Sequence, residues 1–430
     1  MPFATVSAAG KKSSAPEFKS ARPEFLKKFK SKRPTDRLAA LAILEPIPSR
    51  ESAELLFQSA FTDDAPEVRE ATVALLQKWR DEPQVGSTLL DLLTKFTKKS
   101  GMDQHTYTVL KGLGGTENRE LQELILRYMD DALGTPKSNQ GLIHSLADNL
   151  GTQADAEALQ TLKLFSRAKF AGKNFGYRRC VYQGIVHVPG DATVDYLIES
   201  LPELRGQVKF DVVTHLIRTT GQNFGGDATK WLGWWIESKR KVPPRNDRIN
   251  PSVSMGRGYY GIPIGAERVV FVLDASGSMR GGKIEAAKRE LSEAIQSLTP
   301  DVYFGVITFA NRVTVLHPTL VIADEKNKRQ AIYAVMDRNL GGGTSSYDAI
   351  EAAFELGPEA IYFVSDGAPT SGKIVSPPEI VNAIASWNHV RRVSIHSIGI
   401  DTNDTTTAIF SRFMKGIAGM SWGEYVAVDK

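Results

Sequence analysis

The feature that most constrains the fold is the nearly unbroken apolar run V-V-F-V-L-D at residues 269–274. Its β-branched and aromatic residues predict a strand, and the lack of polar alternation predicts that both faces of this strand are covered. A helical pattern follows shortly afterwards, K-I-E-A-A-K-R-E-L-S-E-A-I-Q-S-L. A doubly covered strand followed by a helix is typical of a parallel sheet with crossover helices.

The same alternation continues along the rest of the sequence. Further strand-like runs are V-Y-F-G-V-I-T-F-A, A-I-Y-F-V-S-D, V-S-I-H-S-I-G-I and E-Y-V-A-V, and V-T-V-L-H-P-T-L-V-I-A predicts an edge hairpin. A last helix is expected over Thr407–Gly419. We therefore predict an α/β domain over residues 266–430, with a doubly wound, mostly parallel, Rossmann-like sheet. Ligands of such sheets bind beyond the carboxyl ends of the strands.

Residues 35–240 show a helical period throughout, with apolar residues three and four positions apart and short Gly, Pro or Asp turns between the helices. About twelve helices are expected, paired into hairpins. A hairpin of this kind cannot bury its own apolar face, so the hairpins must stack into an all-α solenoid. The segment Asp64–Leu76, D-A-P-E-V-R-E-A-T-V-A-L-L, resembles a HEAT repeat.

Two further segments complete the predicted organisation. Residues 1–34 are rich in Lys, Ser and Pro, and the first 50 residues carry eleven Lys or Arg against four Asp or Glu. We expect this basic segment to be a solvated, flexible tail, with contact to nucleic acid or an anionic surface as the alternative. Residues 241–265 lose all periodicity and contain four prolines and four glycines, which predicts a linker.

Composition limits the cellular context only partly. No stretch of about 18 apolar residues predicts a membrane span. The N-terminus lacks a complete signal peptide, although V-S-A-A resembles a cleavage site, so we expect a cytoplasmic protein unless the start is truncated. The single cysteine, Cys180, excludes an intrachain disulfide and a zinc site built from cysteines. The compartment and the oligomeric state stay open.

Small oxygen-bearing side chains follow three strand-to-loop junctions of the predicted sheet. They are Asp274, Ser276 and Ser278 in D-A-S-G-S, Thr344 in G-G-G-T-S-S, and Asp366 in V-S-D-G. Side chains two positions apart in an extended segment point the same way, which explains the alternation in D-A-S-G-S. Two carboxylates and three hydroxyls are hard donors. They predict a site for Mg²⁺ or Mn²⁺, with Ca²⁺ as a further option, rather than for zinc or copper.

This pattern resembles the von Willebrand factor A domain with its metal-ion-dependent adhesion site, over residues 266–430. The resemblance implies that Ser276 and Ser278 bind the metal directly, and that Thr344 does so when a ligand is engaged. It implies that Asp274 and Asp366 act mainly through water. It also implies that a carboxylate of a partner protein fills the open position on the metal.

The sequence offers no catalytic set, so we expect no enzymatic activity. The run G-S-M-R-G-G-K-I-E is not a phosphate-binding loop, because Ile284 follows Lys283, and Ser365 does not lie in a G-x-S-x-G elbow. The leading hypothesis is a metal-dependent protein-binding or scaffold module, with the solenoid as a second interaction surface. A metal-dependent hydrolase is the least favoured alternative.

RNA binding is the second hypothesis, because helical repeats ahead of this domain resemble the architecture of the Ro autoantigen family, and the basic tail adds support. Against it, about 200 helical residues are too few to close a ring. The repeat region also carries no net positive charge.

Overall fold

The computed structural model describes residues 15–242, 258–400 and 407–428. The chain divides into two compact units, Met1–Lys173 and Asn174–Lys430, which are described separately below. The boundary between the units therefore lies inside the region predicted as one solenoid, and not at residue 240.

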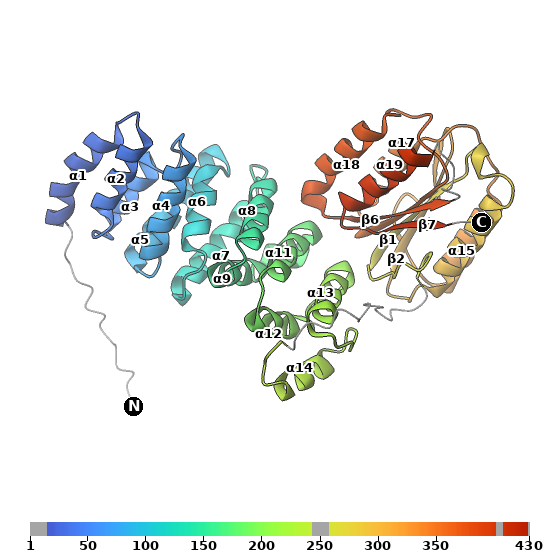
Figure 1. The fold of residues 1–430 in the computed structure, drawn as a ribbon, viewed down its shortest axis with the longest axis horizontal. Helices are drawn as coiled ribbons and strands as arrows, with labels where there is room; N and C mark the ends of the chain where they lie inside the picture. Colours follow the sequence, from blue (N-terminus) through green and yellow to red (C-terminus); the bar gives the residue numbers. More distant parts are fainter. Residues whose placement is uncertain (1–14, 243–257, 401–406, 429–430) are drawn as a thin grey trace. The chain divides into compact units, whose positions relative to one another are not determined.

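The first unit is entirely helical within the described residues. Its helices are α1 (Ala15–Phe29), α2 (Pro34–Leu44), α3 (Arg50–Ser59), α4 (Pro66–Trp79), α5 (Pro83–Ser100), α6 (Gln104–Leu113), α7 (Arg119–Leu133), α8 (Gln140–Gln153), α9 (Ala156–Ser166) and α10 (Lys169–Lys173). Helices α2, α4, α6 and α8 contact one another in sequence, and so do α3, α5, α7 and α9 (Figure 1). These two stacked layers are those of a helical solenoid. The closer likeness to HEAT repeats stays a prediction.

Helix α1 corrects the prediction of a flexible tail for the part of residues 1–34 that the structure describes; residues 1–14 lie outside the described residues. Phe18, Phe25 and Phe29 lie seven and four positions apart, so they share one helical face. Phe25 is fully buried, its ring stacks on that of Phe29, and α1 packs on α2. Burial of these aromatic rings outweighs the polar composition of the segment.

The second unit begins with helices and continues with the sheet. Its elements before the sheet are α11 (Phe175–His187), α12 (Asp191–Ser200), α13 (Gly206–Thr220) and α14 (Ala228–Glu237). The sheet strands are β1 (Arg268–Asp274), β2 (Tyr303–Phe309), β3 (Val313–Val315), β4 (Val321–Ile322), β5 (Ala360–Ser365), β6 (Ser394–Ile400) and β7 (Tyr425–Val428). Their order is β3-β2-β1-β5-β6-β7, with β4 also paired to β2.

The predicted α/β fold is confirmed. All strand pairs are parallel except those of β3 and β4, which each run antiparallel to β2. The prediction of a hairpin within residues 313–323 is wrong, because β3 and β4 pair with β2 and not with each other. The intervening helices are the short 3₁₀ turn η1 (Gly277–Met279), α15 (Lys283–Ser297), α16 (Glu325–Met336), α17 (Ser346–Glu355), α18 (Pro377–Arg391) and α19 (Thr407–Gly419). Helices α15 and α16 bury one face of the sheet, and α17, α18 and α19 bury the other (Figure 1).

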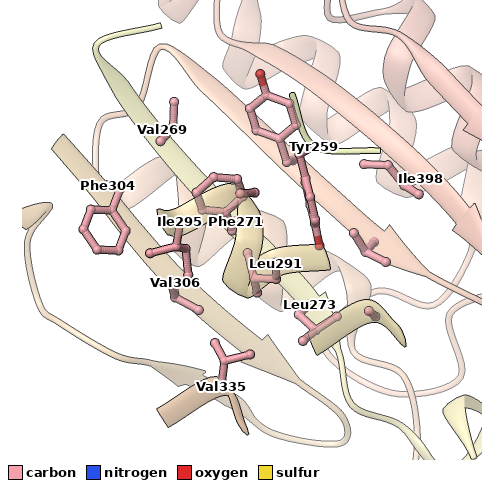
Figure 2. Close-up of a cluster of buried hydrophobic side chains, with 14 of the residues drawn as sticks. Tyr259, Val269, Phe271, Leu273, Leu291, Ile295, Phe304, Val306, Val335 and Ile398 are labelled. Carbon is pink, nitrogen blue, oxygen red and sulfur yellow. The ribbon is translucent and has the colours of Figure 1, made fainter. Parts of the chain in front are cut away.

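The end of the predicted linker is part of the core on the α15 face. Tyr259 and Ile262 are both 1% exposed and pair with each other through backbone hydrogen bonds. The ring of Tyr259 meets that of Phe271 edge-on at 5.4 Å between centroids (Figure 2). These contacts hold the end of the predicted linker on the domain, while residues 243–257 lie outside the described residues.

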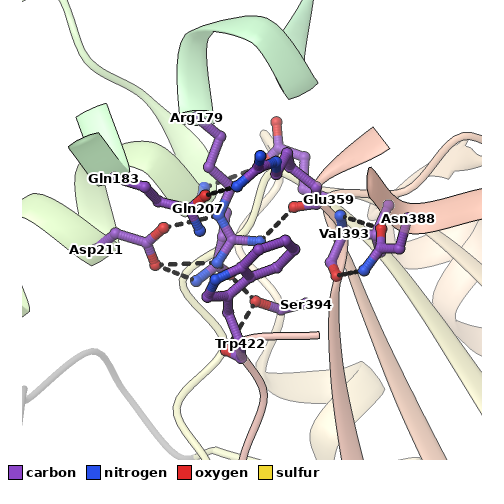
Figure 3. Close-up of polar contacts among 10 residues, drawn as sticks. Arg179, Gln183, Gln207, Asp211, Glu359, Asn388, Val393, Ser394 and Trp422 are labelled. Atoms are coloured by element: carbon purple, nitrogen blue, oxygen red, sulfur yellow. Dashed lines mark hydrogen bonds and ion pairs between the residues drawn. The ribbon is translucent and has the colours of Figure 1, made fainter. Parts of the chain in front are cut away.

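Helices α11 and α13 cover the amino edge of the sheet through the buried Arg179. Its guanidinium pairs with Asp211 of α13 at 2.7 Å and donates to Ser394 Oγ at 2.8 Å and to the carbonyl of Arg392 (Figure 3). It also lies over the ring of Trp422, in the turn between α19 and β7. One side chain therefore holds two helices to β6 and to the final turn of the chain.

A buried carboxylate reinforces the same contact. Glu359 Oε2, directly before β5, accepts hydrogen bonds from the backbone N–H groups of Gln207 at 2.9 Å and Glu267 at 3.0 Å. Burial raises the pKa of Glu359, and the two N–H donors lower it. Gly206 has φ +53°, and a Cβ there would lie 2.2 Å from the carboxylate, so the close approach requires glycine.

We predict that Arg179→Met destabilises the protein by about 3 kcal/mol, because it leaves Asp211, Ser394 and the carbonyl of Arg392 without their cation. Urea denaturation measures the change. Arg218→Met, an exposed position on α13, is the matched control and should change stability by less than about 0.5 kcal/mol. Equal stability of the two variants would contradict a structural role for Arg179.

The buried His396 on β6 predicts a pH dependence. Burial, and secondarily the charge of Arg179, lower its pKa to about 3, so the folded protein favours the neutral ring. Stability that depends on this neutral ring is complete above the ordinary value of 6.5 and is lost as pH falls towards 3. His396→Gln should reduce this loss by about 1 kcal/mol per pH unit below that value. The exposed His389→Gln is the control. If the dependence of unfolding free energy on pH were the same in His396→Gln as in this control and in wild type, His396 would not be its source.

Candidate metal centre at the carboxyl edge

The ends of two neighbouring strands bring distant parts of the sequence together. Strands β1 and β5 run parallel, with Leu273 opposite Val364, so Asp274 and Ser365 end at the same edge of the sheet. β2 ends beside them, since Phe309 pairs with Asp274. The loops that follow these strands therefore meet at one place, as the sequence predicts.

Asp274 lies buried at this carboxyl edge of the sheet. Its side chain is fully buried and accepts hydrogen bonds from Ser276 N at 2.8 Å and from Ser365 Oγ at 2.6 Å. Burial raises the pKa of Asp274 to about 6; the Ser365 and Ser276 hydrogen bonds lower it, and the charge of Asp366 raises it. The carboxylate is thus costly to charge unless further donors or a cation support it.

A chain of oxygen atoms leads from Asp274 to the surface. Ser276 Oγ lies 2.9 Å from Ser278 Oγ, and Ser278 donates to Asp366 Oδ1 at 2.6 Å. Ser276 is 2% exposed, whereas Ser278 is exposed, so the chain opens to solvent at its outer end. Four of the five predicted residues are therefore linked by hydrogen bonds.

The local backbone differs from the extended segment predicted for D-A-S-G-S. Ser276 is extended, with φ −73° and ψ 165°, and Gly277–Met279 then form the 3₁₀ turn η1. The convergence of the two serine hydroxyls thus comes from an extended residue followed by a tight turn, because η1 folds Ser278 back beside Ser276.

The fifth predicted residue, Thr344, lies in a loop that backbone contacts tie to the same edge. Gly341 pairs with Ser276 and donates its N–H to the carbonyl of Ala275 at 2.8 Å. Thr344 is 5% exposed and exchanges two hydrogen bonds with Thr370: its N–H donates to Thr370 Oγ1, and its carbonyl accepts from Thr370 N. The hydroxyl of Thr344 takes part in no side-chain hydrogen bond with the other four residues in the described structure.

The donor chemistry fits a hard divalent cation. No group of three or more His, Cys, Asp or Glu side chains in the described ranges is arranged to hold a metal. A cation at this edge would therefore depend on the serine and threonine hydroxyls and on two carboxylates, a combination suited to Mg²⁺, which retains part of its water shell. Binding of a metal by these five residues stays a prediction.

Two side chains at this edge of the sheet are not among the five predicted residues. Lys283, at the start of α15, forms an ion pair with Asp366 at 2.9 Å between Nζ and Oδ2. Ser365 is a buried donor to Asp274. Both residues were considered only as parts of catalytic motifs. Ser365 ends a strand and Lys283 begins the helix after D-A-S-G-S, and these positions are the sequence features that place both residues at this edge.

Comparison with known proteins agrees with this geometry. Residues 269–368 match the family model of the von Willebrand factor type A domain. This stretch of the chain is therefore similar to a von Willebrand factor type A domain. The match to the family model runs from β1, which ends at Asp274, past β5, which leads to Asp366. It therefore includes all five predicted residues.

Curated relatives match part of the chain. Inter-alpha-trypsin inhibitor heavy chain H4 of Homo sapiens is 31% identical over 153 residues, which is 31% of this chain and 16% of the relative. The mouse heavy chain 4 is 28% identical with the same coverage, and heavy chain H3 of Bos taurus is 35% identical over 112 residues, 24% of this chain and 13% of the relative. The chain thus spans less than a fifth of the length of these relatives.

Two solved structures are similar to part of the chain. A von Willebrand factor type A protein from Catenulispora acidiphila is 24% identical, with a TM-score of 0.34, and the match covers 39% of this chain and 40% of that one. The BatB protein from Bacteroides thetaiotaomicron is 21% identical, with a TM-score of 0.30, over 38% and 90% of the two chains. Separately, no helix in the described part of the chain has the length and apolar character to cross a membrane.

We predict that Ser365→Ala destabilises the cation-free protein by about 1–3 kcal/mol above about pH 6, because the charged Asp274 loses its side-chain donor. Below that pH the carboxyl is protonated and the loss should shrink. Urea denaturation in EDTA at two pH values measures this. Ser292→Ala, which removes a hydroxyl from α15 that bonds only within the helix, is the control. A Ser365→Ala protein as stable as wild type at both pH values would contradict the prediction.

Proposed function

We propose that this chain is a protein-binding module whose von Willebrand factor type A domain holds a divalent cation and captures an acidic residue of a partner protein. Ser276, Ser278 and Thr344 would hold the cation directly, with Asp274 and Asp366 acting through water. The observation that carries the proposal is the hydrogen-bonded chain from Asp274 through the two serines to Asp366, which opens to solvent at Ser278.

The chain's own residues support such a role before any cation arrives. Asp274 accepts from the backbone N–H of Ser276 and thereby fixes the start of the 3₁₀ turn that presents both hydroxyls. Lys283 pairs with Oδ2 of Asp366 and so holds this carboxylate at the site. A bound cation supplies an electrophilic centre for an incoming carboxylate, and the neutral hydroxyls leave its charge largely uncompensated.

The solenoid would supply a second interaction surface, since stacked helical layers form extended surfaces. The curated relatives are named as heavy chains of an inhibitor, which supports a role in an assembly. The RNA-binding alternative predicts a steep loss of RNA affinity between about 50 and 200 mM salt. No observation in the described structure favours it over protein binding.

We expect the cation-free wild type to bind one Mn²⁺, seen as a loss of the electron paramagnetic resonance signal of free Mn²⁺, and Mg²⁺ to displace it. Ser276→Ala and Thr344→Ala should each weaken binding at least about tenfold, because each removes a direct ligand, equivalent to about 1.4 kcal/mol. Ser292→Ala is the matched control. Wild-type protein that leaves the free Mn²⁺ signal unchanged at millimolar concentrations would refute the cation site.

Partner capture then tests the acidic ligand. Immobilised wild-type protein should retain partner proteins in Mg²⁺ and release them in EDTA. Immobilised Ser276→Ala protein should not retain these partners in Mg²⁺. Retention that is equal in Mg²⁺ and EDTA would assign partner binding to another surface of the chain.

Lys283→Met should raise the affinity for Mn²⁺ by about tenfold. The ammonium group of Lys283 lies 2.9 Å from Asp366 Oδ2, so its positive charge repels a divalent cation near the same carboxylate. The Mn²⁺ titration measures this as well. Weaker binding in Lys283→Met would show instead that the lysine is needed to position Asp366 for the cation.

A further inference from the structure

A cavity of about 400 Å³ lies between α16 and the strands β2 and β3, on the α15 face of the sheet. Its floor includes the buried side chains of Val306 and Val335. Thr308, Thr314 and Arg338 add polar groups to the lining. An apolar floor with a few polar groups is the usual character of a site that binds a side chain or small molecule.

Two of these polar groups lack partners within the protein. Thr308 is 6% exposed, and its hydroxyl forms no side-chain hydrogen bond in the described ranges. Arg338 is half-buried, and its Nε is buried without a hydrogen-bond partner among the described residues. A buried donor without a partner is unfavourable, so Arg338 Nε favours an incoming acceptor. The hydroxyl of Thr308, in the same lining, can donate to that acceptor as well. The neighbouring Asp337 is exposed, so water solvates its charge.

The cavity ends close to the proposed cation site. Asn339 lines it, and Gly341, two residues later, pairs with Ser276 and donates to the carbonyl of Ala275. Two residues of extended chain span at most about 7 Å. A partner segment that places one side chain at Ser276 can therefore place another, two or three residues away, in the cavity.

We propose that this cavity is a binding subsite for a second acidic side chain, preferably glutamate, of the partner segment that supplies the cation's ligand. The carboxylate would accept from Arg338 and Thr308, and its methylene groups would pack on Val306 and Val335. The exposed Tyr333 at the rim, 73% exposed, would cover the occupied cavity. The spacing of the two acidic residues rests on the proposed function; the carboxylate preference of the cavity does not.

The first experiment tests the cavity alone, in EDTA. Saturation-transfer NMR with about 10 mM N-acetylglutamate methylamide should detect binding to the full chain, and the glutamine analogue should bind several-fold more weakly. Thr308→Val and Arg338→Ala should abolish the signal, and the matched control Arg329→Ala, exposed on α16, should preserve it. No signal with wild type, or equal signals in all variants, would overturn the proposal whether or not the chain binds a cation.

The second experiment tests the link to the cation site. Peptides carry one Asp followed, after one or two glycines, by Glu or Ala, and are measured in Mg²⁺. The Glu peptides should bind about tenfold more tightly than the Ala peptides, and Arg338→Ala should remove only this gain. Equal affinity of Glu and Ala peptides for wild type would overturn the proposed spacing. Failure of all the peptides, with the cavity signal intact, would instead point to failure of the proposed function.

Discussion

The carboxylate of Asp274 is the group on which the candidate site depends. It lies fully buried where β1 ends, and its two oxygens are held by the backbone of Ser276 and by the hydroxyl of Ser365 at the end of β5. One side chain thus connects two strands and sets the conformation of the loop between β1 and α15. The cost of burying its charge is the physical reason why the outer oxygen atoms gather here, because each donor or cation nearby lowers that cost.

The amino and carboxyl edges of the sheet make different contacts. Helices α11 and α13 close the amino edge through Arg179 and Glu359, and the same contact includes the turn after α19. The carboxyl edge, by contrast, carries the exposed Ser278 and the cavity beside α16. A partner can therefore reach the oxygen-rich loops without disturbing the contacts that hold α11 and α13 to the domain.

Much of this arrangement is predictable from local sequence. The switch from a helical period to covered strands predicted the sheet, the order of its elements and the loops of the five site residues, because these depend on patterns within a few positions. Lys283 and Ser365 were missed because their contacts with Asp366 and Asp274 span 83 and 91 positions. The assignment of α11 to the second unit likewise depends on a contact of Arg179 with Ser394, 215 positions away. Helix α1 was not predicted, because its many lysines indicated a solvated tail although three phenylalanines share one helical face.

A crystal structure of the wild-type chain grown with Mn²⁺, with anomalous diffraction measured at the manganese edge, tests the central claim most directly. The account predicts a single anomalous peak within about 2.0–2.3 Å of the hydroxyl oxygens of Ser276 and Ser278, close to Thr344 and enclosed by water bound to Asp274 and Asp366. A map without a peak at this edge, in which Ser278 still donates to Asp366 and Lys283 still pairs with it, would contradict the account.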